Sequence, residues 1–132
     1  MRAAVSSQQA QPHVRRAGLW FGFLGGGIAW TLHLLSAYAI AEFGCVGGLG
    51  ERQYGSISLV AWLELIATGL TVCLALAATA CAYRCERRLR SQEETAAVGE
   101  KTTARAGLFA SGSFAFVILF ESIPIFFYLR DC

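Results

Sequence analysis

A long uncharged stretch near the amino terminus constrains this chain more than any other feature. From Gly18 the sequence GLWFGFLGGGIAWTLHLLSAYAIAE continues for about 24 residues before its first charged side chain, Glu42. A helix rises ~1.5 Å per residue, so this stretch can cross the hydrocarbon layer of a bilayer, which is about 30 Å thick. One ionisable group, His33, lies near its middle, where lipid penalises such a side chain. The stretch therefore predicts a transmembrane helix whose histidine needs a partner inside the protein.

Two further apolar segments predict a three-span membrane protein. The predicted spans cover about residues 17–43, 57–83 and 104–129. Single carboxylates, Glu64 and Glu121, interrupt the second and third spans; the third is expected to begin near Thr103, whose hydroxyl would cap it, and to kink at Pro124. With 55% hydrophobic and only 15% charged residues, the chain is too apolar for a soluble domain of this length. We therefore expect one all-α integral membrane domain, residues 17–132, built as a bundle of three transmembrane helices.

The basic residues are distributed unevenly, and this predicts the orientation. One side of the expected bundle carries nine of them, against Arg52 and Arg130 on the other side. The nine are Arg2, Arg15, Arg16, Arg84, Arg87, Arg88, Arg90, Lys101 and Arg105. The positive-inside rule places this group in the cytoplasm. Residues 1–16 are then a disordered cytoplasmic arm and residues 84–103 a basic cytoplasmic loop, while the flexible, glycine-rich loop 44–56 and the carboxyl terminus lie outside.

Small residues recur at helical spacing along all three predicted spans, and in the third span they are Gly107, Ser111 and Ala115. Gly18, Gly22 and Gly26 repeat every four residues in the first span and form a flat groove that another helix backbone can approach closely. Two interpretations remain open: the groove packs against the chain's own helices, or it receives a helix of another protein. The second span carries a narrow stripe of polar and small residues that also indicates a helix contact. Its members are Ala61, Glu64, Thr68, Thr71, Ala75, Ala78 and Ala82.

Each predicted span carries one ionisable side chain at a similar depth. His33, Glu64 and Glu121 lie on the order of 10–14 Å below the outer interface, at ~1.5 Å per residue. Because an isolated titratable group in lipid costs several kcal/mol, we expect the three side chains to face inward and meet. Their meeting has three interpretations: mutual neutralisation that fixes helix packing, a site for a proton or cation, or a ligand set for a transition metal. Haem is not expected, because His13 lies in the polar arm and not in a span.

The predicted topology places two of the five cysteines on the outer side. Cys45 and Cys132 each follow the end of a span, so in an oxidising compartment they can form a disulfide that ties the outer loop to the carboxyl terminus. The alternative is that these thiols take part in redox or copper chemistry. Cys73 and Cys81 lie inside the second span and are expected to behave as small apolar residues.

The first span and the chain end resemble a known group of small membrane proteins. The run GGGIAWTLHLLSAYAIAEFGC looks like the first helix of three-span proteins encoded beside haem–copper terminal oxidase subunits and their assembly factors. In that group a glycine-rich start leads to Trp-x-x-His, a tyrosine five residues later and a cysteine just outside, and the third helix runs to a proline and a terminal cysteine. The corresponding residues here are Trp30, His33, Tyr38, Cys45, Pro124 and Cys132. The resemblance implies association with respiratory oxidase biogenesis in the bacterial plasma membrane.

No catalytic motif accompanies these features. The sequence has no Ser-His-Asp order, HExxH, CxxC pair or nucleotide-binding loop, and its net charge of +2 gives no reason to expect nucleic acid as a partner. We therefore expect no enzymatic activity, no cofactor, and an accessory role in which the glycines of the first span pack against oxidase subunits or an assembly factor. The alternative is a small transporter or channel component that moves protons or cations past His33, Glu64 and Glu121. Three helices are too few to enclose a pathway, so this alternative requires a homo-oligomer.

Overall fold

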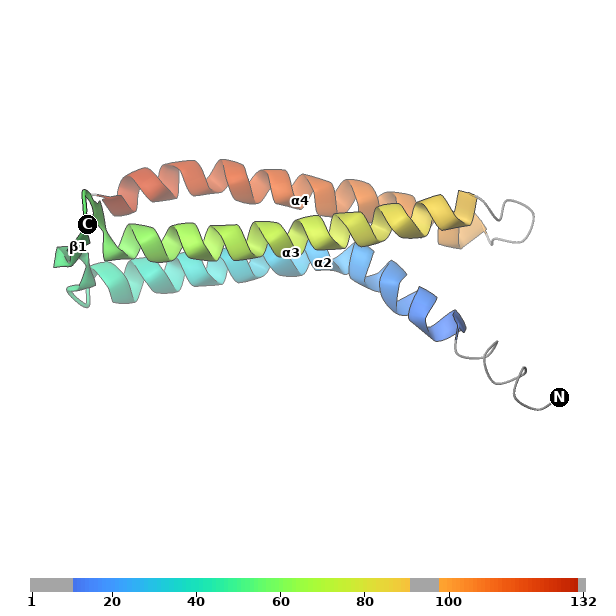
Figure 1. The fold of residues 1–132 in the computed structure, drawn as a ribbon, viewed down its shortest axis with the longest axis horizontal. Helices are drawn as coiled ribbons and strands as arrows, with labels where there is room; N and C mark the ends of the chain where they lie inside the picture. The colour runs from blue at the N-terminus through green and yellow to red at the C-terminus, as the bar shows by residue number, and fades with distance from the viewer. Residues whose placement is uncertain (1–10, 91–97, 131–132) are drawn as a thin grey trace.

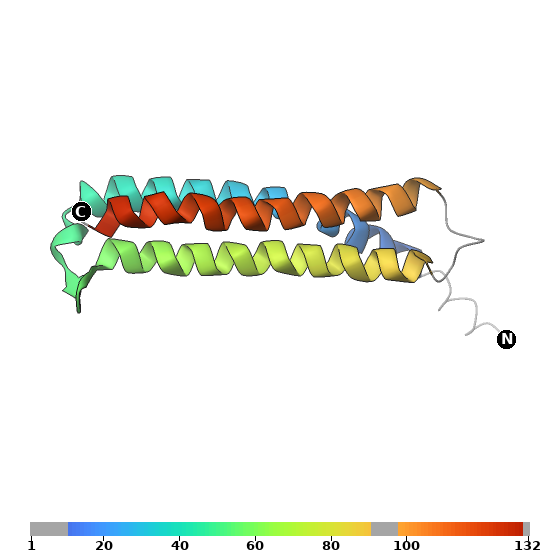
Figure 2. The ribbon, with the colours of Figure 1, turned by 90° about the horizontal axis from the view of Figure 1, so that it is seen from above.

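Three long helices lie side by side in one elongated bundle, seen from two directions in Figures 1 and 2. The computed structural model describes residues 11–90 and 98–130. Its long helices are α2 (Gln11–Ala39), α3 (Leu59–Arg90) and α4 (Val98–Arg130). α3 runs antiparallel to α2 and α4, and each helix contacts the other two. Each is long and apolar enough to cross a membrane, so the expected three-helix architecture is present.

The helices are longer than a hydrocarbon layer is thick. They contain 29, 32 and 33 residues, which corresponds to about 44–50 Å at ~1.5 Å per residue. Their ends therefore extend past an apolar layer of about 30 Å. We call the end where α2 connects to α3 the hairpin end, and the end where α3 finishes with Arg87, Arg88 and Arg90 the arginine end.

The first helix begins earlier than the sequence predicts. α2 starts at Gln11, so residues 11–16 are helical and do not belong to the disordered arm expected over residues 1–16. Residues 1–10 lie outside the described part of the chain. The amino-terminal turns of α2 lean away from the other two helices (Figure 1).

The expected loop 84–103 is also largely helical. α3 continues to Arg90 and α4 already begins at Val98, while residues 91–97 lie outside the described part. Thr103 is therefore inside α4, where its hydroxyl donates to the carbonyl of Gly99 at 2.8 Å and does not cap the helix. The apolar pattern marks the segments that are able to lie in lipid, whereas Arg, Glu, Lys and Ala are good helix formers and continue the helices beyond those segments.

The connection between α2 and α3 is built from short regular elements. A π-helical turn, η1 (Ile40–Cys45), and a 3₁₀ turn, η2 (Leu49–Glu51), lead into a hairpin of β1 (Gln53–Tyr54) and β2 (Ile57–Ser58). Its antiparallel register pairs Gln53 with Ser58, and Gly55 takes the positive φ of 73° that a two-residue turn of this kind needs. Backbone hydrogen bonds also link Gly47 to Phe43 and Arg52 to Leu49, so regular hydrogen bonding is present in parts of the loop that was expected to be a flexible turn.

Ser58 joins two helix ends at the hairpin end. Its Oγ accepts from the backbone N–H of Ala61 at 3.2 Å, as an N-cap of α3 does, and it donates to the carbonyl of Leu129 near the end of α4 at 3.0 Å. One buried hydroxyl thus satisfies a donor of one helix and an acceptor of the other.

The core consists mainly of small residues, with a few large aliphatic ones among them. The stripe predicted for α3 faces inward, since all its members are buried except Thr68, which is half-buried. One apolar cluster lies mid-bundle, and a second lies at the arginine end. The first contains Ala29, Ala75, Ala115 and Ile118, and the second contains Leu19, Leu89 and Ala104.

Candidate functional site

His33 and Glu64 lie next to each other in the interior of the bundle. His33 of α2 is 0% exposed and Glu64 of α3 is 1% exposed. The His33 Nε2 and Glu64 Oε1 atoms are 4.0 Å apart, within ion-pair range but too far for a direct hydrogen bond. The structure thus brings together two of the three ionisable residues that the depth argument placed in one layer.

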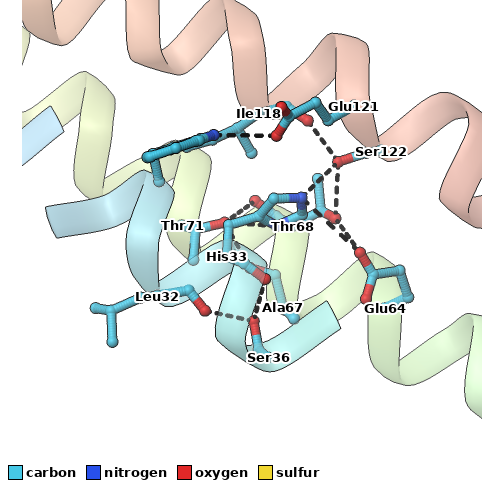
Figure 3. Close-up of polar contacts among 11 residues, drawn as sticks. Leu32, His33, Ser36, Glu64, Ala67, Thr68, Thr71, Ile118, Glu121 and Ser122 are labelled. Atoms are coloured by element: carbon cyan, nitrogen blue, oxygen red, sulfur yellow. Dashed lines mark hydrogen bonds and ion pairs between the residues drawn. The ribbon is translucent and has the colours of Figure 1, made fainter. Parts of the chain in front are cut away.

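Three hydroxyl groups surround this pair (Figure 3). Ser122 Oγ of α4 lies 3.3 Å from His33 Nε2, and Thr71 Oγ1 of α3 lies 3.5 Å from His33 Nδ1. Thr68 Oγ1 lies 3.2 Å from Ser122 Oγ and donates to Glu64 Oε1 at 3.5 Å. These five residues, His33, Glu64, Thr68, Thr71 and Ser122, are called the polar cluster below; all three helices contribute to it.

One atom of the polar cluster has no hydrogen-bond partner. Within the described residues, Glu64 Oε2 is the buried side-chain oxygen or nitrogen that no other group contacts at hydrogen-bond distance. An ionised carboxylate offers about four acceptor positions, so the Glu64 carboxyl group is poorly satisfied as an anion. A buried polar atom of this kind is costly to a fold, because its desolvation is not compensated by a hydrogen bond.

Glu121 takes a different partner from the one expected. Its Oε2 accepts a hydrogen bond from Trp30 Nε1 at 3.0 Å, and no hydrogen bond or ion pair among the described residues joins it to His33 or Glu64. The Trp30 ring also packs against Phe114, with ring centroids 5.7 Å apart. The expected meeting of three ionisable groups is therefore a pair with a separate Trp–Glu contact beside it.

This geometry does not assemble the metal ligand set considered from the sequence. The set of His33, Glu64 and Glu121 is not brought together, and the described residues contain no group of three or more His, Cys, Asp or Glu side chains placed to hold a metal ion. The polar cluster instead offers one imidazole, one carboxyl group and hydroxyls.

The glycines of α2 are covered by the chain's own helices. A β-carbon at Gly22 would lie 2.9 Å from Ala82 Cβ, and one at Gly26 would lie 2.5 Å from Ser111 Cα. Gly18 is looser, because its nearest neighbours are the sulfur atoms of two α3 cysteines at 3.4 and 3.6 Å. Of the two interpretations of the Gly18, Gly22 and Gly26 groove, the described structure contains the internal one.

Ser111 of α4 forms two hydrogen bonds to the backbone of α2, where these two helices lie close together. It donates to the Gly22 carbonyl at 2.6 Å and accepts from the Gly26 backbone N–H at 3.3 Å, in a fully buried position. Sequence reasoning treated Ser111 as a small residue and did not consider Ser122 at all. A weak signal existed for both, because a serine inside an apolar span is a polar group that lipid does not satisfy.

An apolar groove remains open on the surface between α2 and α4. Its volume is about 420 Å³, and one of its lining residues is Gly27, where a β-carbon would meet only the Phe114 ring at 3.7 Å. We call it the α2–α4 groove. Its lining residues are Leu24, Gly27, Ile28, Trp30, Thr31, Leu32 and Phe114.

The cysteine prediction falls partly outside the described residues. Cys45 lies in η1, at the hairpin end where the carboxyl end of α4 also lies, but Cys132 is outside the described part. Cys81 is half-buried, and its thiol donates weakly to the carbonyl of Gly18 at 3.6 Å. Cys73 faces outward on α3.

Comparison of the chain with models of protein families, with curated proteins and with solved structures finds no match.

Proposed function

We propose that this chain is a non-enzymatic accessory membrane protein that packs against subunits of a respiratory terminal oxidase, or against one of its assembly factors, in the bacterial plasma membrane. The resemblance of the first span indicates the class of partner. The α2–α4 groove is the surface to which we expect the partner to bind, and it is the observation that carries the proposal.

Three of the residues behind the resemblance, all on α2, differ in their surroundings. Trp30 and His33 have partners inside the chain, namely Glu121 and Ser122. Tyr38 has none of this shielding, because 70% of its surface is exposed. Packing within the chain therefore explains the first two, whereas Tyr38 is available to another protein.

The α2–α4 groove suits a transmembrane helix of such a partner. Gly27 and Thr31 line it one turn apart, and small residues at this spacing let a second helix come close in lipid. Tyr38 lies on the same face of α2, about two turns beyond Thr31 and three turns beyond Gly27, because residues 7 and 11 positions apart return to one side of a helix. A partner helix can thus contact the groove and the tyrosine together, without displacing the covered glycines.

Filling the groove tests this surface. Gly27→Leu places a side chain where a β-carbon has only the Phe114 ring within 4 Å, so we expect the bundle itself to fold with this change. The matched control is Gly69→Leu, an exposed glycine of α3 with no atom within 4 Å of its β-carbon position. We expect oxidase subunits to copurify with the wild type and with Gly69→Leu but not with Gly27→Leu. Equal copurification with both variants contradicts the proposal.

A second candidate is a transporter or channel component for protons or cations. The observation that favours it is the buried His33–Glu64 pair with its unpartnered carboxyl oxygen. Three helices enclose no pathway, so this function requires a homo-oligomer. Native mass of the purified protein discriminates: a stable symmetric oligomer favours transport, and a monomer that copurifies with oxidase subunits favours the accessory role.

The proposed topology places the arginine end in the cytoplasm and the hairpin end, with a Cys45–Cys132 disulfide, outside. The uneven distribution of basic residues supports the orientation. A membrane-impermeant thiol reagent added to whole cells should label Ser56→Cys and not Arg84→Cys, each made in a cysteine-free chain. Mass analysis of freshly purified, unreduced protein tests the disulfide, and two unmodified outer thiols contradict it.

A further inference from the structure

The burial of Glu64 demands a compensating positive charge or a proton. Glu64 is 1% exposed, and among the described residues its ion-pair partner is His33, with no arginine or lysine near it. The other charged group facing this region, Glu121 of α4, is an acid that bonds to Trp30. A carboxylate buried without a compensating partner costs several kcal/mol. The proton can be on Glu64 as a carboxylic acid or on His33 as an imidazolium, and each state holds one proton in the pair.

The hydroxyl groups present acceptors to both nitrogens of the imidazole ring. Thr71 donates to the Ala67 carbonyl at 2.9 Å, and Ser122 donates to the Ile118 carbonyl at 2.6 Å, each closer than its contact with His33. Each hydroxyl has a single hydrogen, so with these bonds made the oxygen turns lone pairs toward the ring. A doubly protonated His33 satisfies both contacts, at 3.3 and 3.5 Å.

The carboxyl group favours the opposite state. Glu64 Oε2 has no donor, and Oε1 has only the Thr68 hydroxyl at 3.5 Å. A neutral carboxylic acid needs fewer donors than a carboxylate, so protonated Glu64 suits these surroundings. Contacts on one side of the pair therefore stabilise the proton on His33, and those on the other side stabilise it on Glu64.

A bridge of hydroxyls connects the two groups. The direct gap from His33 Nε2 to Glu64 Oε1 is 4.0 Å, but the route through Ser122 Oγ and Thr68 Oγ1 has steps of 3.3, 3.2 and 3.5 Å (Figure 3). When the hydroxyl of Ser122 turns from the Ile118 carbonyl toward Thr68, these atoms form a continuous hydrogen-bonded path.

We propose that His33 and Glu64 together bind one exchangeable proton, which the hydroxyls of Ser122 and Thr68 pass between the imidazole and the carboxyl group. In the transfer, the Nε2–H bond of imidazolium breaks, Ser122 receives that proton and gives its own to Thr68, and Thr68 gives its own to Glu64 Oε1. Both hydroxyls keep one hydrogen, imidazolium becomes imidazole, and carboxylate becomes carboxylic acid. This site holds its proton whichever of the two proposed roles the protein has.

Counting the protons on the pair tests the binding site. The sequence has two histidines, so His13→Gln leaves His33 as the sole imidazole. In full-length protein in lipid nanodiscs at neutral pH, ¹⁵N NMR of the ring reports its protonation, and infrared spectroscopy reports the carbonyl band of a protonated carboxyl group. Glu64→Gln and Glu121→Gln assign that band to one residue or the other.

We expect the imidazolium fraction of His33 and the acid fraction of Glu64 to sum to one proton. A sum of zero or of two overturns the proposal. Loss of the acid band when sodium replaces choline in the buffer also overturns it, because a metal cation then neutralises Glu64.

Removing a hydroxyl tests the transfer route. In the parent His13→Gln protein, rapid transfer averages the Nε2 resonance of His33 between its two states. We expect Ser122→Ala and Thr68→Val to slow the transfer, so that the averaged resonance separates into the signals of the two states, since each variant breaks the bridge while changing little volume. The control is Ser36→Ala. The hydroxyl of Ser36 donates to the backbone carbonyls of Leu32 and His33 and forms no hydrogen bond with the imidazole ring of His33. An averaged resonance that survives in both bridge variants overturns the route.

Discussion

Gly25 of α2 lies so close to Ala78 of α3 that no side chain fits between them. A β-carbon at Gly25 would be 2.7 Å from Ala78 Cβ, whereas ordinary contacts of such atoms are 3.4–4 Å. Gly25→Ala must therefore separate α2 and α3 by about 0.7 Å or more, and overpacking of this kind costs about 1–3 kcal/mol. Alanine also gains up to about 1 kcal/mol of helix propensity over glycine. Gly69→Ala, with open space around it, carries that gain alone and is the reference.

The identity of the obstructing atom predicts which second change restores stability. At Gly25 the obstruction is one methyl group, and the next nearest atoms belong to Phe21 of the same helix at 3.5 Å. Gly25→Ala with Ala78→Gly exchanges the two residues, leaves the summed helix propensity unchanged and removes the clash. We expect the exchange to bring the free energy of unfolding back to within about 0.5 kcal/mol of the wild type, because the two contacting residues are coupled and the second change removes the clash.

Gly26 is the contrasting case, because its obstruction is backbone. A β-carbon there would be 2.5 Å from Ser111 Cα, as well as 2.9 Å from the Ser111 side-chain atoms. Ser111→Gly removes the side chain but leaves the Cα atom, and it also removes two buried hydrogen bonds. Gly26→Ala should therefore destabilise the bundle and should not be restored by Ser111→Gly.

Unfolding of the purified protein in mixed micelles with increasing SDS, followed by far-ultraviolet circular dichroism, measures all these variants. The result that refutes the packing argument is a reversed pattern, in which Ala78→Gly fails to restore Gly25→Ala or Ser111→Gly restores Gly26→Ala. Either outcome means that the helices do not approach each other along this line of glycines.

The same unfolding measurement checks three further predictions. His33→Ala leaves Glu64 buried without its partner and should cost about 3–5 kcal/mol, most of which His33→Ala with Glu64→Leu recovers; no recovery contradicts a direct interaction. Trp30→Phe keeps an aromatic ring but removes the donor to Glu121 and should cost about 1.5–3 kcal/mol, whereas an unchanged stability excludes that bond. Glu86→Gln weakens ion pairs to two arginines that are 65% and 66% exposed, so it should cost less than about 1 kcal/mol and nothing in high salt.

The length of the uncharged segments predicted the three helices, because lipid accepts only apolar side chains and internally bonded backbone over about 30 Å. The same logic did not predict the helix ends. Beyond the apolar segments, hydropathy does not distinguish a helix from a loop. The residues that end at Arg90 are charged, and charged residues occur both in exposed helices and in loops. The internal bonding of the loop 44–56 was missed for a related reason: its glycines, such as Gly55, indicate turns without showing which groups pair.

For the candidate site, depth was predictable and direction around the helix was not. His33 and Glu64 lie at one level with small residues on their own faces, and they meet. Glu121 and Ser122 share that level, but consecutive helical residues point about 100° apart, so only one of them can face His33. The serine faces it, and the glutamate contacts Trp30 instead. The sequence around Glu121 and Ser122 is apolar on every side of the helix, so it does not show which of the two side chains faces His33.

The polar cluster draws its members from all three helices, and this has a consequence for biogenesis. As the chain is synthesised, α2 emerges first with an imidazole that no lipid can satisfy, α3 follows with the carboxyl group of Glu64, and Ser122 comes last on α4. No helix pair completes the hydrogen bonding. We therefore expect the segments to leave the translocon together, and a chain truncated before α4 to be retained there or degraded.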